Sequence, residues 1–298
     1  MPPKVGSVRT SSLEISYEEC GSQAGPTIIL MHGWPYGPRV YDQVVPPLVE
    51  AGCRTIVPCL RGFGLTRFLS AETPRSGQQA ALGDDLRQLM DALNVGNAVL
   101  VGYDWGGRAA CIAAALWPER VRALVTGDGY NIQDIPNSGA PAAPEQEWRQ
   151  WYQYYFNLER GRAGLRANRR ELCKLLWRLW SPHWEFDDAA FRQTAAAWDN
   201  PDFVDVTIHS YRHRYGNAPG DPALEPIEHA LASQPSISVP AIVLHGEANG
   251  IAPEMSDKHR RKFLNLVEQR NIPRAGHNLP AEVPDIVSAA VLALLKDG

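Results

Sequence analysis

A single carboxylate, Asp104, stands in a glycine-framed turn that reads G-Y-D-W-G over residues 102–106. An apolar run at 98–101 precedes the turn and an alanine-rich stretch at 108–116 follows it, which predicts a strand, a sharp turn and a helix. Glycine two residues before and after Asp104 relieves crowding where the strand meets the helix. A positioned carboxylate can displace a leaving group from saturated carbon and form an ester. The alternative is an Asp that only caps the helix.

His277 is the candidate general base. It is the last histidine in the chain, and it follows a strand-like run at 269–272 and a turn at 273–276. A histidine on the loop after the last strand is placed to take a proton from water, because imidazole titrates near neutral pH. His32 and His245 end earlier predicted strands, where packing roles are expected.

An acidic side chain must orient the imidazole, and two loops can supply it. Asp128 lies between two glycines directly after the strand-like run 122–126, next to the strand that carries the first carboxylate. The other loop follows the run 241–244 and holds Glu247 and Asn249, of which only Glu247 is acidic. We therefore predict Asp128 as the orienting acid, with Glu247 as the alternative. Asp128 as a plain turn residue also stays open.

Two backbone N–H groups form a candidate oxyanion hole. The sequence H-G-W-P at 32–35 follows the apolar run 27–31. The N–H of Trp34, together with that of Trp105, could stabilise the negative charge that develops when water attacks an Asp104 ester. A simple Gly-Pro turn is the alternative.

The apolar runs predict an α/β fold with a mostly parallel sheet and helices on both faces. They lie at 27–31, 55–57, 98–101, 122–126, 241–244 and 269–272, with an edge or hairpin strand at 13–19 and helices at 83–93 and 108–116. Residues 133–234 hold no such run. We expect residues 1–132 and 235–298 to form the core and 133–234 an inserted helical lid over the strand ends, where ligands bind. An independent helical domain is the alternative.

The composition excludes several classes of function. The chain has 298 residues, 44% of them hydrophobic and 21% charged, and a formal net charge of -4. This charge argues against nucleic acid or an anionic membrane as a partner. There is no apolar stretch of transmembrane length and no signal-peptide core, so a cytoplasmic protein is expected. Five cysteines without a C-x-x-C pair predict reduced thiols, and no metal-ligand spacing or phosphate loop occurs, so no cofactor is expected.

These features together resemble the α/β-hydrolase superfamily over nearly the whole chain. H-G-W-P, the turn G-Y-D-W-G-G, the helical insertion and the terminal G-H at 276–277 occur in the order found in its Asp-nucleophile branch. That branch holds epoxide hydrolases and haloalkane or haloacid dehalogenases. The resemblance implies the α/β-hydrolase fold and covalent catalysis by Asp104 and His277. No G-x-S-x-G occurs, so a serine esterase is not expected.

Two lid tyrosines favour epoxide opening to a vicinal diol. Epoxide hydrolases of this branch use two lid tyrosines as donors to the epoxide oxygen, and Tyr152 and Tyr211 fit these positions. Ring opening expels an alkoxide, a poor leaving group unless an acid with a pKa of about 10 faces it. The alternative is that the tyrosines only pack. Further substrate contacts are expected from His32, Tyr154 and Arg108.

A dehalogenase with the same Asp, His and Asp is the second hypothesis. Trp105 matches one halide donor of the haloalkane enzymes, and Trp34 can complete a tryptophan pair. Fluoroacetate-type enzymes hold the substrate carboxylate with two arginines, one directly after the nucleophile. Here Trp105 takes that position and only Arg108 remains, while Gln153-Tyr154 replaces a halide-binding His-Trp pair. Both departures count against a haloacid substrate.

A catalytically silent ligand-binding homologue is the third hypothesis, and Asn249 motivates it because an acid is expected there. The expected partners are a small apolar epoxide or organohalide and water. The identity of the substrate, the enantioselectivity and the oligomeric state, a homodimer included, stay open.

Overall fold

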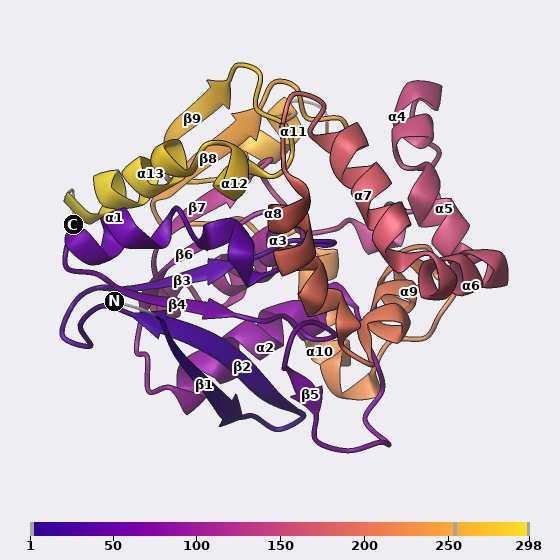
Figure 1. Cartoon of the computed structure of the whole chain (residues 1–298), viewed down its shortest axis with the longest axis horizontal. Helices are drawn as coiled ribbons and strands as arrows, with labels where there is room; N and C mark the ends of the chain where they lie inside the picture. The colour runs from indigo at the N-terminus through magenta and orange to yellow at the C-terminus, as the bar shows by residue number, and fades with distance from the viewer. Residues whose placement is uncertain (1–2, 253–254, 297–298) are drawn as a thin grey trace.

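The structure is a computed structural model that describes residues 3–252 and 255–296. Its central element is a nine-stranded sheet (Figure 1). The strands follow the order β1 (Lys4–Arg9), β2 (Leu13–Cys20), β4 (Arg54–Pro58), β3 (Thr27–Met31), β6 (Ala98–Gly102), β7 (Val121–Gly127), β8 (Ala241–Gly246) and β9 (Leu266–Ile272). A short β5 (Arg67–Phe68) pairs with β2 outside this order.

The sheet is parallel from β4 through β9 and antiparallel at β1, β2 and β5. The predicted mostly parallel α/β architecture is confirmed. The sequence does not predict β1, because its side chains are mostly exposed and it has no apolar run. Strands β6 and β8 are buried throughout, as expected for strands covered on both faces.

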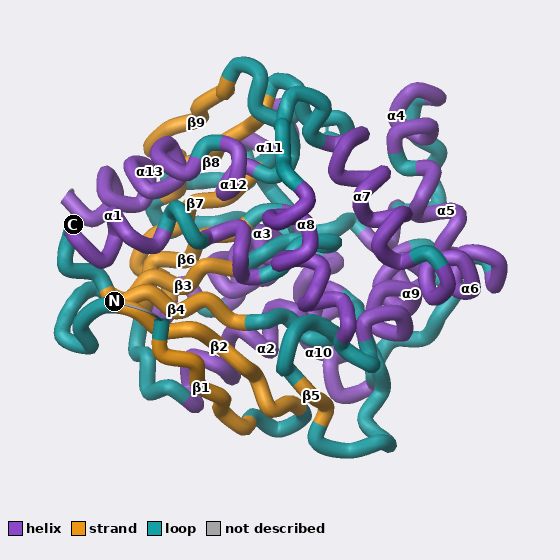
Figure 2. Tube along the Cα trace, viewed as in Figure 1, coloured by secondary structure: helices purple, strands orange, loops and turns teal. Residues whose placement is uncertain are grey.

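Helices cover both faces of the sheet (Figure 2). On one face, α2 (Gln79–Ala92) packs closely against α3 (Asp104–Leu116). On the other, α1 (Val45–Glu50) packs against α13 (Pro284–Lys296). Two short helices, α11 (Asp257–Arg260) and α12 (Leu279–Glu282), flank β9 along the chain. Parallel strands end at one edge of such a sheet, so the loops after β3, β6, β7 and β8 lie close together.

Between β7 and β8 the chain leaves the sheet and forms a helical insertion, residues 133–234. Every residue of this segment is described, and it holds helices and 3-10 turns but no strand. Its helices are α4 (Pro144–Arg149), α5 (Trp151–Asn157), α6 (Glu159–Ala167), α7 (Arg169–Trp180), α8 (Asp188–Ala195), α9 (Phe203–Arg214) and α10 (Glu225–Ala232). In Figure 1 they form one group beside the sheet. Over residues 3–252 and 255–296, we find no helix with the length and hydropathy to cross a bilayer.

Candidate active site

The turn between β6 and α3 displays Asp104 in a left-handed conformation, with φ of 52°. Non-glycine residues rarely adopt this conformation, and residues that do so cluster at functional sites. A Cβ on Gly106 would lie 2.0 Å from the Met31 carbonyl oxygen, and one on Gly102 would lie 2.5 Å from the Gly106 backbone. The predicted need for glycine on both sides of Asp104 is confirmed.

The two oxygens of the Asp104 carboxylate have different surroundings. Oδ1 accepts hydrogen bonds from the backbone N–H groups of Trp34 and Trp105, each at 2.7 Å. Oδ2 lies 3.7 Å from Nε2 of His277. Charge-assisted bonds to backbone donors fix an anion firmly. One oxygen is therefore held, while the other faces the imidazole.

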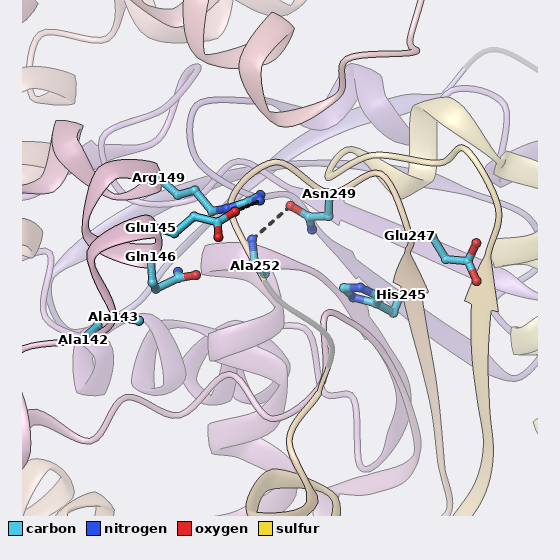
Figure 3. Close-up of a pocket in the computed structure, with 9 residues that line it drawn as sticks. All are labelled: Ala142, Ala143, Glu145, Gln146, Arg149, His245, Glu247, Asn249 and Ala252. Carbon is cyan, nitrogen blue, oxygen red and sulfur yellow. Dashed lines mark hydrogen bonds and ion pairs between the residues drawn. The ribbon is translucent and has the colours of Figure 1, made fainter.

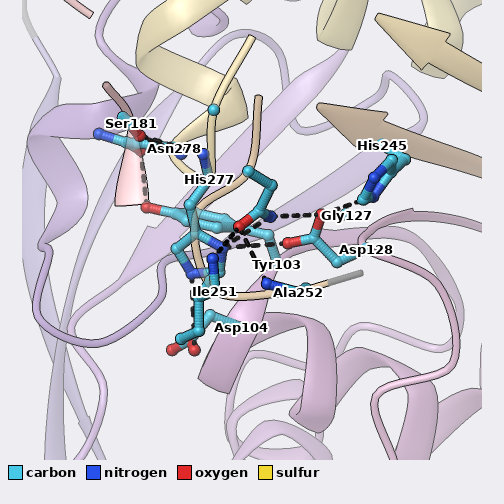
Figure 4. A network of polar contacts seen from close by, with 12 residues as sticks. Tyr103, Asp104, Gly127, Asp128, Ser181, His245, Ile251, Ala252, His277 and Asn278 are labelled. Atoms are coloured by element: carbon cyan, nitrogen blue, oxygen red, sulfur yellow. Dashed lines mark hydrogen bonds and ion pairs between the residues drawn. The ribbon is translucent and has the colours of Figure 1, made fainter. Parts of the chain in front are cut away.

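Asp128 is the carboxylate that meets His277. It ends the turn after β7, the strand that pairs with β6, and its Oδ2 lies 3.1 Å from Nδ1 of His277 (Figure 4). Its φ of 62° is also left-handed. Glu247, the alternative acid, is exposed, whereas the carboxylate at Nδ1 of the imidazole belongs to Asp128. The geometry therefore favours Asp128.

Asn249, where the sequence lacks an expected acid, supports Asp128 instead of replacing it. Its Nδ2 donates to Oδ1 of Asp128 at 2.9 Å and lies 3.2 Å from Nδ1 of His277. Its own Oδ1 accepts from the N–H groups of Ile251 and Ala252, which fixes the amide orientation. A second imidazole, His245, has Nδ1 at 3.3 Å from the same Asp128 oxygen. The sequence offered no signal for this arrangement.

The helical insertion holds the loop that carries His277. The N–H of His277 donates to the Trp180 carbonyl oxygen at 3.1 Å and to Ser181 Oγ at 3.0 Å, at the end of α7. The next residue, Asn278, accepts from the Tyr103 hydroxyl at 2.8 Å. The loop that carries His277 is thus held by the end of α7 and by Tyr103, the residue before Asp104.

The charges of this cluster are coupled. Burial opposes ionisation of His277, yet the negative charges of Asp104 and Asp128 beside it raise its pKa to about 9. The pKa values of both carboxyls are lowered despite burial, that of Asp104 by His277 and Arg108 and that of Asp128 by its two histidines. At neutral pH an imidazolium therefore lies between two carboxylates. It can act as a base only after one of those negative charges is removed.

Aromatic rings from the insertion close over Asp104. The ring of Tyr152 stacks on Trp34 at 6.0 Å, and the ring of Tyr211 lies edge-on, 5.5 Å from both. Both tyrosines are fully buried. Burial is the main cause that raises their pKa values, and the charge of Asp104 adds to it. The hydroxyls are therefore neutral and within electrostatic reach of the carboxylate.

Gln153 determines how the Tyr152 hydroxyl is used. Its Oε1 accepts from Arg214 Nη1 at 2.6 Å and from the Tyr215 hydroxyl at 2.9 Å. These two donors fix the amide orientation, so Nε2 donates to the Tyr152 oxygen at 3.1 Å. A hydroxyl that accepts this bond keeps its own proton for another acceptor. In the sequence, Gln153 stands out only because it replaces a halide-binding residue, and nothing there predicts this role.

The two tryptophan indoles differ in a way that bears on halide binding. Nε1 of Trp34 donates to Thr207 Oγ1 at 2.9 Å and is therefore occupied. Nε1 of Trp105 is buried and has no hydrogen-bond partner among the described residues. The tryptophan pair left open by the sequence therefore provides one free donor.

Two residues expected to contact the substrate have partners within the protein. His32 is fully buried, its Nε2 accepts from the Leu60 N–H and its Nδ1 contacts the Gly33 carbonyl oxygen, so both ring nitrogens hold the loop. Burial lowers its pKa to about 4. Tyr154 is 39% exposed and directs its hydroxyl to Glu147. It lies two positions from Tyr152 on α5, which places it on another face of the helix.

A cavity of about 790 Å³ adjoins the orienting residues (Figure 3). Its walls come from α4 and from the loop after β8, including His245 and Asn249. Neither Asp104 nor His277 lines it. Over the described residues, no three His, Cys, Asp or Glu side chains are grouped to hold a metal ion.

Comparison with known proteins places this geometry in a family. The model of the alpha/beta hydrolase fold matches residues 26–283. The chain belongs to the α/β-hydrolase-fold family. A crystal structure of a provisionally designated epoxide hydrolase from Klebsiella pneumoniae is 45% identical, with a TM-score of 0.96 over 98% of this chain and 97% of that one.

Two curated relatives are more distant. The AB hydrolase superfamily protein YfhM of Bacillus subtilis is 27% identical over 302 residues and 97% of each chain. A haloalkane dehalogenase of Mycolicibacterium paratuberculosis is 31% identical over 154 residues, 51% of this chain and 49% of that protein. The chain is thus an epoxide hydrolase-like α/β hydrolase.

Gly106→Ala should destabilise the protein, because the new Cβ would approach the Met31 carbonyl oxygen to 2.0 Å. Overpacking typically costs about 1–3 kcal/mol, so the urea midpoint should fall. Gly139→Ala is the matched control, since a Cβ there meets nothing within 4 Å. Equal midpoints for the two variants would contradict the close approach of β3 and α3.

His277 should titrate near pH 9 in NMR spectra of the free protein, and Asp104→Asn should lower that pKa because it removes a neighbouring negative charge. An unfolded histidine has a pKa of about 6.5. The stabilisation is therefore complete below that pH and is lost as the pH rises through about 9. An imidazole that titrates near its ordinary value in both proteins would refute the coupling.

Proposed function

We propose that this protein is an epoxide hydrolase that works through a covalent Asp104 ester. The observation that carries the proposal is the Tyr152 hydroxyl, which is buried near Asp104 and accepts a hydrogen bond from Gln153. Its proton is thereby left for an acceptor inside the site. The Klebsiella pneumoniae relative at 45% identity supports the same assignment.

In the first step, Oδ2 of Asp104 attacks an epoxide carbon and the ring C–O bond breaks. The leaving oxygen becomes an alkoxide and takes a proton from Tyr152 or Tyr211. Oδ1 stays on the N–H groups of Trp34 and Trp105, which orients Oδ2. An alkoxide is a poor leaving group, so a neutral tyrosine aimed at it lowers the barrier.

The ester then changes the state of His277. Esterification removes the Asp104 charge that helps to raise the pKa of the imidazole. The imidazolium can then give up its proton, which restores the proton that the tyrosine donated. Neutral His277, oriented by Asp128, next takes a proton from water as that water attacks the ester carbonyl.

Ester hydrolysis uses the same backbone donors as the resting state. The attack places negative charge on the carbonyl oxygen held by the N–H groups of Trp34 and Trp105. Collapse of this intermediate releases a vicinal diol and regenerates the Asp104 carboxylate and the imidazolium. The oxygen of the water enters Asp104, and the diol takes the carboxylate oxygen that made the attack.

In this scheme the helical insertion serves as a lid. Tyr152 and Tyr211 both come from it, and its Trp180 packs edge-on to the His277 ring at 5.3 Å. Excluding water from the epoxide would strengthen every electrostatic contact with the reacting atoms.

Dehalogenation is the second candidate. The buried, partnerless Nε1 of Trp105 favours it, because a halide needs such a donor. The occupied indole of Trp34 counts against a two-tryptophan halide site. Asn249 suggested a catalytically silent binding protein because an acid is expected at that position. Asp128 contacts the imidazole instead, so this reason for the hypothesis is weaker.

His277→Gln should stop the reaction at the ester, because glutamine cannot take the proton of water. Intact-protein mass spectrometry should then show the added mass of the epoxide, located on the peptide that contains Asp104. The double variant Asp104→Asn/His277→Gln is the control and should gain no mass. Undiminished turnover without His277 would exclude the scheme.

Tyr152→Phe and Tyr211→Phe should each lower kcat for diol formation from styrene oxide by about 10²-fold or more, as expected for loss of a donor to developing negative charge. Tyr154→Phe is the matched control, because its hydroxyl contacts Glu147. Halide release from haloalkanes should be measured in parallel. Halide release that survives both Phe variants, without any diol formation by the parent protein, would favour dehalogenation instead.

A further inference from the structure

Arg108 is a buried cation, and two of its guanidinium nitrogens lack a hydrogen-bond partner in the described part of the chain. It lies one helical turn after Asp104 in α3 and is 6% exposed. Its Nε and Nη1 are buried and have no partner among the described residues. Leaving guanidinium donors unpaired away from water is costly. Burial is the main cause that lowers its pKa to about 10; Arg214 lowers it further, whereas Asp104, Tyr211 and Tyr152 raise it.

Arg214, the last residue of α9, is a second cation at the same place. It donates to Gln153 Oε1, and its guanidinium lies 5.2 Å from the centre of the Tyr211 ring. The side-chain oxygen of Gln133, in the orientation that its neighbours require, accepts from Nε and Nη2. These partners are neutral, and no carboxylate pairs with Arg214 in the described part of the chain.

Arg214 also lines a cavity of about 730 Å³, together with Gln133, Gln153 and Tyr215. It therefore stands between this cavity and the buried tyrosine pair. The carboxylate of Glu147 lines the same cavity but is bonded to the Tyr154 hydroxyl. Arg214 thus contacts this cavity and also the Tyr211 ring of the candidate site.

The reaction makes this excess of positive charge greater. In the resting state Asp104 offsets part of the charge of Arg108. Once Asp104 is an ester, no carboxylate among the described residues forms an ion pair with either arginine. A negative group on the substrate would restore the balance, and a planar carboxylate matches the guanidinium fork.

We propose, building on the epoxide hydrolysis argued above, that the substrate is an epoxide carrying a carboxylate, and that Arg108, assisted by Arg214, binds this group. The carboxylate provides the acceptors that the Arg108 donors lack. The aromatic rings of Trp34, Tyr152 and Tyr211 then surround the oxirane end. This assignment replaces the wholly apolar substrate expected from the sequence.

A competing explanation is that the arginines only stabilise the tyrosinate formed on ring opening. The two differ in a measurable way. Stabilisation of a tyrosinate would raise kcat equally for charged and neutral epoxides. A carboxylate subsite discriminates between them, chiefly through KM.

The test uses 3-phenyloxirane-2-carboxylate and its primary amide, which differ only in the charged group. The parent protein should prefer the carboxylate by about tenfold or more in kcat/KM, as expected for a charge-assisted hydrogen bond. Arg108→Gln and Arg214→Gln should each reduce this ratio toward one. Arg270→Gln on β9, which removes a guanidinium paired with Glu268, is the control and should keep the ratio.

A binding measurement separates this inference from the proposed reaction. Cinnamate should inhibit or quench tryptophan fluorescence at lower concentration than cinnamamide, and Arg108→Lys, which keeps the charge but not the fork, should weaken only cinnamate binding. A parent protein that turns over the amide as well as the carboxylate overturns the inference. If neither epoxide reacts, the proposed function fails, and cinnamate binding decides the inference alone: dependence on Arg108 upholds it, and equal binding of the two ligands overturns it.

Discussion

The unequal environment of the two Asp104 oxygens is the constraint on which the rest of the site depends. Backbone N–H groups of Trp34 and Trp105 hold one oxygen at 2.7 Å, and the other faces His277 at 3.7 Å. This arrangement needs a left-handed Asp104 and a glycine at 106, where any side chain would strike β3. In the proposed reaction, the strand–turn–helix geometry thus selects which oxygen attacks and which one later receives the oxyanion charge.

The same carboxylate couples the two halves of the proposed reaction through charge. While Asp104 is ionised, His277 is held as an imidazolium between two carboxylates, with a pKa of about 9. Forming the ester removes one of those charges and releases the base when it is needed. The insertion contributes to both halves, since it supplies Tyr152 and Tyr211 and its Trp180 carbonyl anchors the His277 backbone.

The sequence predicts those features that a local pattern of residues specifies. The glycine frame of Asp104, the parallel strands and the strand-free insertion each leave a mark in consecutive residues. Contacts between distant elements leave none: Gln153 on α5 meets Arg214 on α9 only in the folded chain. The sequence does not show that the helix turns Tyr154 to another face than Tyr152, nor that the ring of His32 has backbone partners.

The central claim is that the attacking oxygen belongs to Asp104 and not to water. A single turnover in H₂¹⁸O, with protein in excess over epoxide, tests it directly by mass spectrometry of the diol and of the Asp104 peptide. The account predicts an unlabelled diol and one ¹⁸O in the Asp104 carboxylate. Label in the diol of the first turnover, with an unlabelled Asp104, would contradict it.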